Sequence, residues 1–263
     1  MVDNPLFLSL LGTSFSFLGT ALGAAMVFLF RGQVKVSLQK VFLGFASGIM
    51  LAASFWSLLL PAMELSVQLG MSEWIPAATG FCTGGAFLFL LDKLLPHLHF
   101  GSDKPEGMSS RLKRTTMLVF AVTLHNIPEG MAVGLSFALS AQSGSPVTFA
   151  GALVLAFGMA LQNFPEGAAI SLPLLKEGFS KRKSFACGAL SGIVEPVAGV
   201  IGALLAFTIV QVMPFMLAFA AGAMIYVVVD ELVPQAYNEH TNSATLAAML
   251  GFILMMVLDV AFG

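Results

Sequence analysis

The sequence LHNIPEG at residues 124–130 returns as LQNFPEG at residues 161–167. Each copy lies inside an apolar stretch that is long enough to cross a bilayer. A carboxylate within lipid costs about 2.5–3.5 kcal/mol on insertion scales, so an intramembrane glutamate is seldom without a function. The paired motif therefore predicts a cation-binding site inside a membrane protein.

The composition agrees with a membrane protein. Of the 263 residues, 57% are hydrophobic and only 10% are charged, whereas soluble domains have about 25% charged residues. Eight apolar segments are long enough to span a bilayer: 5–30, 38–61, 73–95, 115–140, 147–174, 184–210, 213–235 and 243–262. No basic residue precedes Arg31, so the first segment is expected to be retained rather than cleaved as a signal peptide. The loops are short, which predicts one all-α transmembrane transporter domain over residues 1–263.

The basic residues are unevenly distributed between the predicted loops. The 12 of them are Arg31, Lys35, Lys40, Lys93, Lys104, Arg111, Lys113, Arg114, Lys176, Lys181, Arg182 and Lys183. They flank the first, third and fifth loops, whereas the second, fourth and sixth loops carry none. Because cytoplasmic loops are enriched in Lys and Arg, we expect the odd-numbered loops in the cytoplasm and both termini outside.

The chemistry of the motif favours a transition metal. Residues four apart share a helix face, so His125 and Glu129 point the same way, as do Gln162 and Glu166. Imidazole nitrogen combined with carboxylate and amide oxygens suits zinc, iron, manganese, cobalt or cadmium. No basic residue lies at mid-membrane to neutralise the acids there, so protons or metal ions are the candidate partners. These acids are Glu129, Glu166, Glu195, Asp230 and Glu231.

Two other function classes compete with metal transport. An intramembrane metal hydrolase would need HExxH or a comparable zinc motif with a free catalytic carboxylate, and the sequence has none. A proton-linked carrier of an organic solute would use the glutamates as proton sites. It stays open as the alternative, and metal-dependent thermal stabilisation would separate it from a metal carrier.

With these residues the chain resembles the ZIP (Zrt/Irt-like) family of divalent metal transporters. HNIPEG and QNFPEG are most similar to the GufA-type branch, and the resemblance covers the whole chain. It implies eight transmembrane helices, in which helices one to three and six to eight form inverted repeats around helices four and five. Gln162 stands where many relatives have His, Asn163 where some have Asp, and Asp230 where many have His. Amides are poorer ligands than imidazole or carboxylate, so a second metal site is expected to hold metal less firmly.

The resemblance also implies roles for individual residues. It places one metal site on His125, Glu129, Gln162 and Glu166, with Met50 nearby. A second, adjoining site would use Asn126, Asn163 and Glu195 and share the two motif glutamates. The outer entrance would involve Ser57 and Glu64, and the inner exit would involve Asp230, Glu231 and His240. Whether one or two metal ions bind stays open.

The predicted function is secondary transport of divalent metals, zinc above all but also cadmium, iron and manganese, into the cytoplasm by alternating access. No enzymatic activity and no prosthetic group are expected. The expected partners are metal ions and the lipid bilayer, with no nucleic acid, because the basic run at 181–183 is interpreted as a topology signal. The glycine-rich residues 80–85 leave a homodimer open. The expected location is a bacterial inner or plasma membrane.

Overall fold

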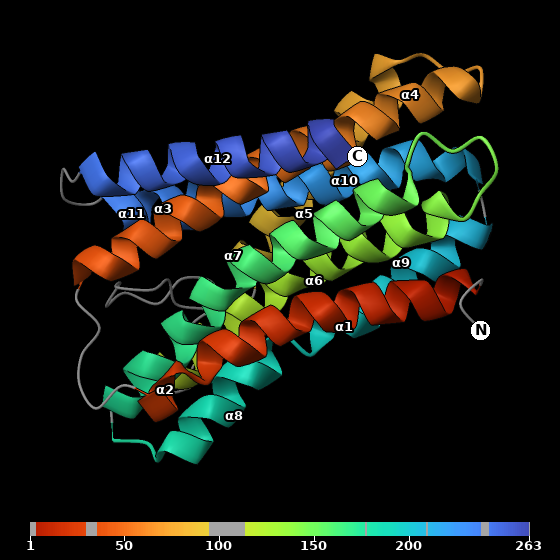
Figure 1. Ribbon diagram of the computed structural model, residues 1–263. Helices are drawn as coiled ribbons and strands as arrows, with labels where there is room; N and C mark the ends of the chain where they lie inside the picture. The colour runs from red at the N-terminus through yellow and green to blue at the C-terminus, as the bar shows by residue number, and fades with distance from the viewer. Residues whose placement is uncertain are drawn as a thin grey trace.

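A computed structural model describes residues 4–29, 36–94, 114–176, 178–208, 210–237 and 242–262. Within these ranges all regular elements are helical (Figure 1). They are α1 (Pro5–Ala24), α2 (Met26–Leu29), α3 (Val36–Ala53), η1 (Ser54–Leu59), α4 (Leu60–Gln68), α5 (Trp74–Leu94), α6 (Arg114–Ser140), α7 (Phe149–Lys176), α8 (Lys181–Ser191), α9 (Val194–Thr208), η2 (Val210–Val212), α10 (Met213–Val227), η3 (Val228–Leu232), α11 (Val233–Tyr237) and α12 (Asn242–Phe262). His240, predicted to assist metal exit, lies outside the described residues.

Seven helical stretches of the described chain are long and apolar enough to cross a membrane. They correspond to seven of the eight predicted segments, and the all-helical membrane class is confirmed. The fourth predicted segment forms α6, which has 27 residues but is not among the seven. The motif residues His125, Asn126 and Glu129 lie in the middle of α6.

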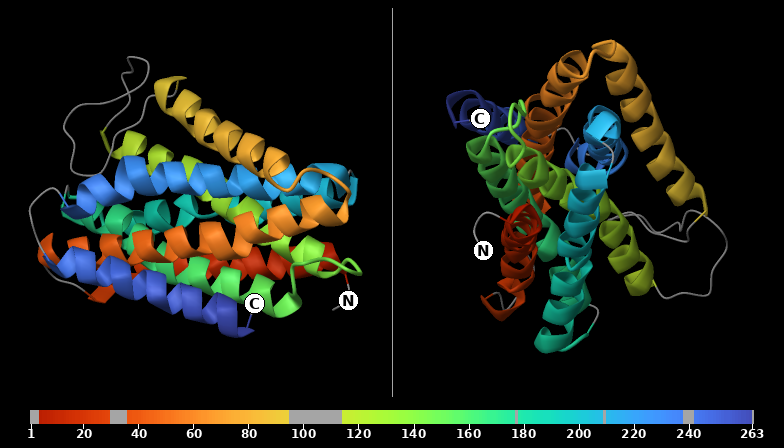
Figure 2. Two further views of the ribbon diagram at one scale, coloured as in Figure 1. Left: turned by 90° about the horizontal axis from the view of Figure 1, so that it is seen from above. Right: turned by 90° about the vertical axis from the view of Figure 1, so that its right-hand side faces the viewer.

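The helices form two blocks. In one, α1 packs along α7 while α9 packs along α6, and α8 covers the end of α1 and α7. In the other, α3 packs along α12 and α5 along α10. Figure 2 shows α5 standing apart at the edge of this second block. The blocks meet where α3 and α12 touch α7 and where α10 touches α6, so the two motif helices lie at the junction.

Two of the spans contain a π-helical turn. Both η1 and η3 are π-helical, and each runs directly into a short helix with proline in its first turn, at Pro61 and Pro234. Proline removes a backbone donor and clashes with the preceding turn, and a widened π turn accommodates such a defect. The π turns carry Ser57 and the Asp230-Glu231 pair.

The predicted sixth segment is also divided. A turn at Gly192 and Ile193 separates α8 from α9. Pro196 follows in the first turn of α9, where a proline is tolerated because its missing N–H would have no helical partner. The break puts Glu195 in that same first turn, where the positive end of the helix dipole favours a carboxylate.

Gly130 sets the distance between α6 and α9. A Cβ at this position would overlap the backbone of Glu195. We expect Gly130→Ala to lower the stability by about 1–3 kcal/mol, as overpacking does, and to lower the melting temperature of the purified protein. Gly85→Ala is the matched control, because the atom nearest to its Cβ would be the Gly222 carbonyl oxygen at 3.7 Å. Equal melting temperatures for the two variants would contradict this close approach.

Candidate metal site

The two copies of the motif meet side by side. Glu129 on α6 and Gln162 on α7 are completely buried, and Nε2 of Gln162 donates to Oε2 of Glu129 at 2.6 Å. The same amide also donates to Oδ1 of the neighbouring Asn163. This contact joins the helices as expected from their antiparallel packing, and it orients one Glu129 oxygen toward α7.

Four buried oxygens of the two motif copies accept no hydrogen bond. They are Oδ1 of Asn126, Oε1 of Glu129, Oε1 of Gln162 and Oε2 of Glu166. Buried polar atoms in proteins are nearly always paired, so such a group needs a physical reason. Carboxylate and amide oxygens are cation ligands. The chemistry of this donor set therefore fits a metal ion.

Glu195 occupies a different environment. Its Oε2 accepts from the Ser16 hydroxyl at 2.5 Å and from Nδ2 of Asn163 at 2.8 Å, and its Oε1 accepts from the Thr20 hydroxyl at 3.1 Å. Asn126, predicted for the same second site, instead directs its Nδ2 to the carbonyl oxygen of Ser191 at 3.2 Å. The residues of the predicted second site are thus held by hydrogen bonds within the protein.

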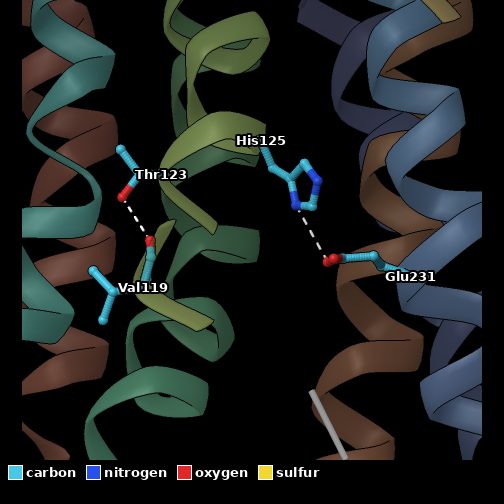
Figure 3. Close-up of polar contacts among 4 residues, drawn as sticks. All are labelled: Val119, Thr123, His125 and Glu231. Atoms are coloured by element: carbon cyan, nitrogen blue, oxygen red, sulfur yellow. Dashed lines mark hydrogen bonds and ion pairs between the residues drawn. The ribbon is translucent and has the colours of Figure 1, made fainter. Parts of the chain in front are cut away.

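His125 reaches across the junction between the two blocks. Its Nδ1 lies 3.2 Å from Oε2 of Glu231 in η3, and both side chains are buried. Figure 3 shows the imidazole pointing from α6 to Glu231, while Thr123 faces the other side of the helix and donates to the Val119 carbonyl oxygen at 2.7 Å. A residue predicted for the central site and one predicted for the exit are therefore direct neighbours.

The remaining predicted positions are distributed along the second block. Ser57 donates to Oδ1 of Asp259 at 2.6 Å, and both residues are buried. Glu64 and Asp230 are exposed. Met50 is fully buried within the apolar core, and the sulfur of Met159 lies 4.0 Å from Nε2 of Gln162.

No three His, Cys, Asp or Glu side chains in the described part of the chain are grouped so that they could hold a metal ion. Two of the four unpaired oxygens belong to carboxylates and two to amides. A metal at the motif would accordingly have both carboxylate and amide ligands. Because the contact with Glu231 uses Nδ1 of His125, Nε2 is the ring nitrogen that could join these ligands while Glu231 orients the imidazole.

Sequence reasoning missed the contribution of α1. Its buried face is a stripe of small and hydroxylic residues at helical spacing: Ser9, Gly12, Thr13, Ser16, Gly19, Thr20, Gly23 and Ala24. This periodic pattern is visible in the sequence and predicts a face packed against other helices. It does not reveal that Ser16 and Thr20 meet Glu195. Asp259 was also missed, although an acid near the end of an apolar span is itself a signal.

Comparison with known proteins gives consistent matches. A family model described as ZIP Zinc transporter matches residues 99–259. The chain is 38% identical to the zinc transporter ZIP11 of Homo sapiens, over 99% of this chain and 98% of the relative. It is 37% identical to the zinc transporter ZIPB of Bordetella bronchiseptica, over 97% of this chain and 81% of the relative. It is also 36% identical to the zinc transporter GufA of Myxococcus xanthus, over 93% of this chain and 96% of the relative.

Proposed function

The chain belongs to the ZIP family of zinc transporters, and from this premise we propose that it is a secondary carrier of divalent transition metals. Zinc is the foremost substrate, and cadmium, iron and manganese are further ones. The ions move into the cytoplasm by alternating access. The metal binds within the membrane between α6 and α7, at the two PEG motifs. Members of this family are integral membrane transporters rather than enzymes.

One observation carries the assignment of the site. The four unpaired oxygens of Asn126, Glu129, Gln162 and Glu166 come from both copies of the motif and are buried. Leaving a buried acceptor unpaired costs about 1–3 kcal/mol, and a bound cation removes that cost for several oxygens at once. An organic solute would need donors of its own to do the same.

Two features of the fold support eight spans with inverted repeats. Figures 1 and 2 show the start of α1 and the end of α12 toward the same end of the bundle, as expected for an even number of crossings in which α6 is the additional span. In an inverted repeat, α1 corresponds to α9 and α6 corresponds to α7, and the packing of α1 along α7 is matched by the packing of α9 along α6. Likewise α3 corresponds to α10 and α5 corresponds to α12, and the packing of α3 along α12 is matched by the packing of α10 along α5. The π turns η1 and η3 occupy equivalent places in spans two and seven.

The division into blocks supports alternating access. The motif helices belong to the block of α1, α6, α7, α8 and α9, whereas the predicted entrance and exit residues belong to the other. Sliding of one block along the other would carry the site between the two sides of the membrane. The contact of His125 with Glu231 joins the blocks in the arrangement described here.

The test is metal uptake into vesicles. The purified full-length protein is reconstituted into liposomes loaded with a dye that responds to zinc and cadmium. We expect saturable zinc uptake that protein-free liposomes lack, and competition by cadmium, manganese and iron that ranks the substrates. Absence of uptake by folded protein under pH gradients of either sign, without metal-dependent thermal stabilisation, would favour the organic-solute carrier instead.

A further inference from the structure

The hydrogen bonds around Glu195 bear on the number of metal ions that the site holds. Both carboxylate oxygens accept from protein donors: Ser16 and Asn163 supply one, and Thr20 the other. All of these side chains are fully buried. Hydrogen bonds to an ionised acceptor are short and strong, and the Ser16 contact, at 2.5 Å, is short. A metal ion at Glu195 would have to displace these donors.

Asn163 is occupied at both ends of its amide. Its Nδ2 donates to Glu195 and, at 3.1 Å, reaches the Ser16 hydroxyl, while its Oδ1 accepts from Gln162. The group that faces Glu195 is thus a donor, which cannot ligate a cation. An aspartate here would present only acceptors to Glu195, and two facing carboxylates favour a cation between them.

The space next to Glu195 is limited as well. A Cβ on Gly192 would lie 2.9 Å from Oε1 of Glu195 and 2.9 Å from the Thr20 hydroxyl oxygen. The turn at Gly192, between α8 and α9, therefore lies close to Oε1 of Glu195 and to the Thr20 hydroxyl. By contrast, the unpaired oxygens of the motif all belong to Asn126, Glu129, Gln162 and Glu166.

We infer that this chain holds a single metal ion at the paired motif. Ser16, Thr20 and Asn163 act as positioning residues that fix Glu195 as a hydrogen-bonded part of the scaffold and withhold it from the metal. The inference rests on the proposed function and deepens it, because it assigns one ion per binding event. It departs from the two-site arrangement that the family resemblance implies.

The experiment counts bound metal. The metal-free full-length protein in detergent is equilibrated with Cd²⁺, separated from free ion by dialysis, and analysed for cadmium per protein. We expect one equivalent for wild type and still one for Glu195→Gln. Asn163→Asp should bind a second equivalent. Asn4→Asp is the matched control, since Asn4 is an exposed N-cap of α1 far along the helix from Ser16, and it should keep one.

Each result has a defined meaning. Two equivalents in wild type that fall to one in Glu195→Gln would overturn the inference and leave the proposed transport function intact. No bound cadmium in folded wild type would instead contradict the proposed function. A single equivalent in folded Asn163→Asp would show that the amide does not close the second position. If that variant does not fold, the comparison of wild type with Glu195→Gln still decides.

Discussion

Alanine at Glu129 or at Glu166 should reduce zinc uptake into vesicles at least about 100-fold. Each variant removes a buried carboxylate from the group of unpaired oxygens. Removing one partner of a buried charge pair costs about 3–5 kcal/mol, and each 1.4 kcal/mol is a factor of ten in affinity. Glu129→Ala additionally leaves Nε2 of Gln162 without its acceptor on α6. The two variants should therefore fail for the same reason, loss of metal binding.

Glu73→Ala is the control for these variants. Glu73 precedes α5 and is exposed, so the same substitution there should leave uptake near the wild-type level. Loss of uptake is interpreted only for variants that keep the elution volume of wild type in detergent. Normal uptake by both Glu129→Ala and Glu166→Ala would place the transport site elsewhere in the protein. Normal uptake by one alone would restrict the essential ligands to the other copy of the motif.

The helices could be predicted because the bilayer requires long apolar segments. The third and eighth predicted segments, 73–95 and 243–262, agree with α5 and α12 to within a residue at each end. Each of these helices contains a long apolar stretch, and the one proline of α5, Pro76, lies in its first turn, where proline is tolerated, so length and composition suffice. The membrane class follows from the same property. The meeting of Glu129 with Gln162 was also foreseeable, since the repeated motif lies on consecutive, antiparallel spans.

The irregular backbone and the distant partners could not be predicted in the same way. A proline predicts a disturbed helix, but Pro128 lies inside continuous α6 while Pro61 follows a π turn. Which outcome occurs depends on the neighbouring helices. Likewise, Ser16 and Glu195 are far apart in sequence, and helical periodicity carries no information on which buried faces meet. The family resemblance implied that Glu195 is a metal ligand, and the sequence does not show that the donors on α1 meet this carboxylate.

Glu231→Gln should weaken apparent zinc affinity in the uptake assay by about 10–100-fold, the usual effect of removing the partner that orients a ligating histidine. Nδ1 of His125 faces Oε2 of Glu231 across the block junction. Glutamine keeps the size of the side chain and removes its charge, so the imidazole loses the group that sets its orientation. The concentration dependence of uptake is the measurement, because a defect in orientation appears as a raised KM.

Asp230→Asn provides the control one residue away. The π turn η3 directs Glu231 inward and leaves Asp230 exposed, so the two acids share a local backbone but differ in burial. An exposed charge contributes about 0–1 kcal/mol, and Asp230→Asn should therefore change KM at most about fivefold. Equal effects of the two substitutions would mean that both acids act on the metal as it leaves. A larger effect of Asp230→Asn would contradict the role given to the His125–Glu231 contact, since the exposed acid would then be the one that the ion requires.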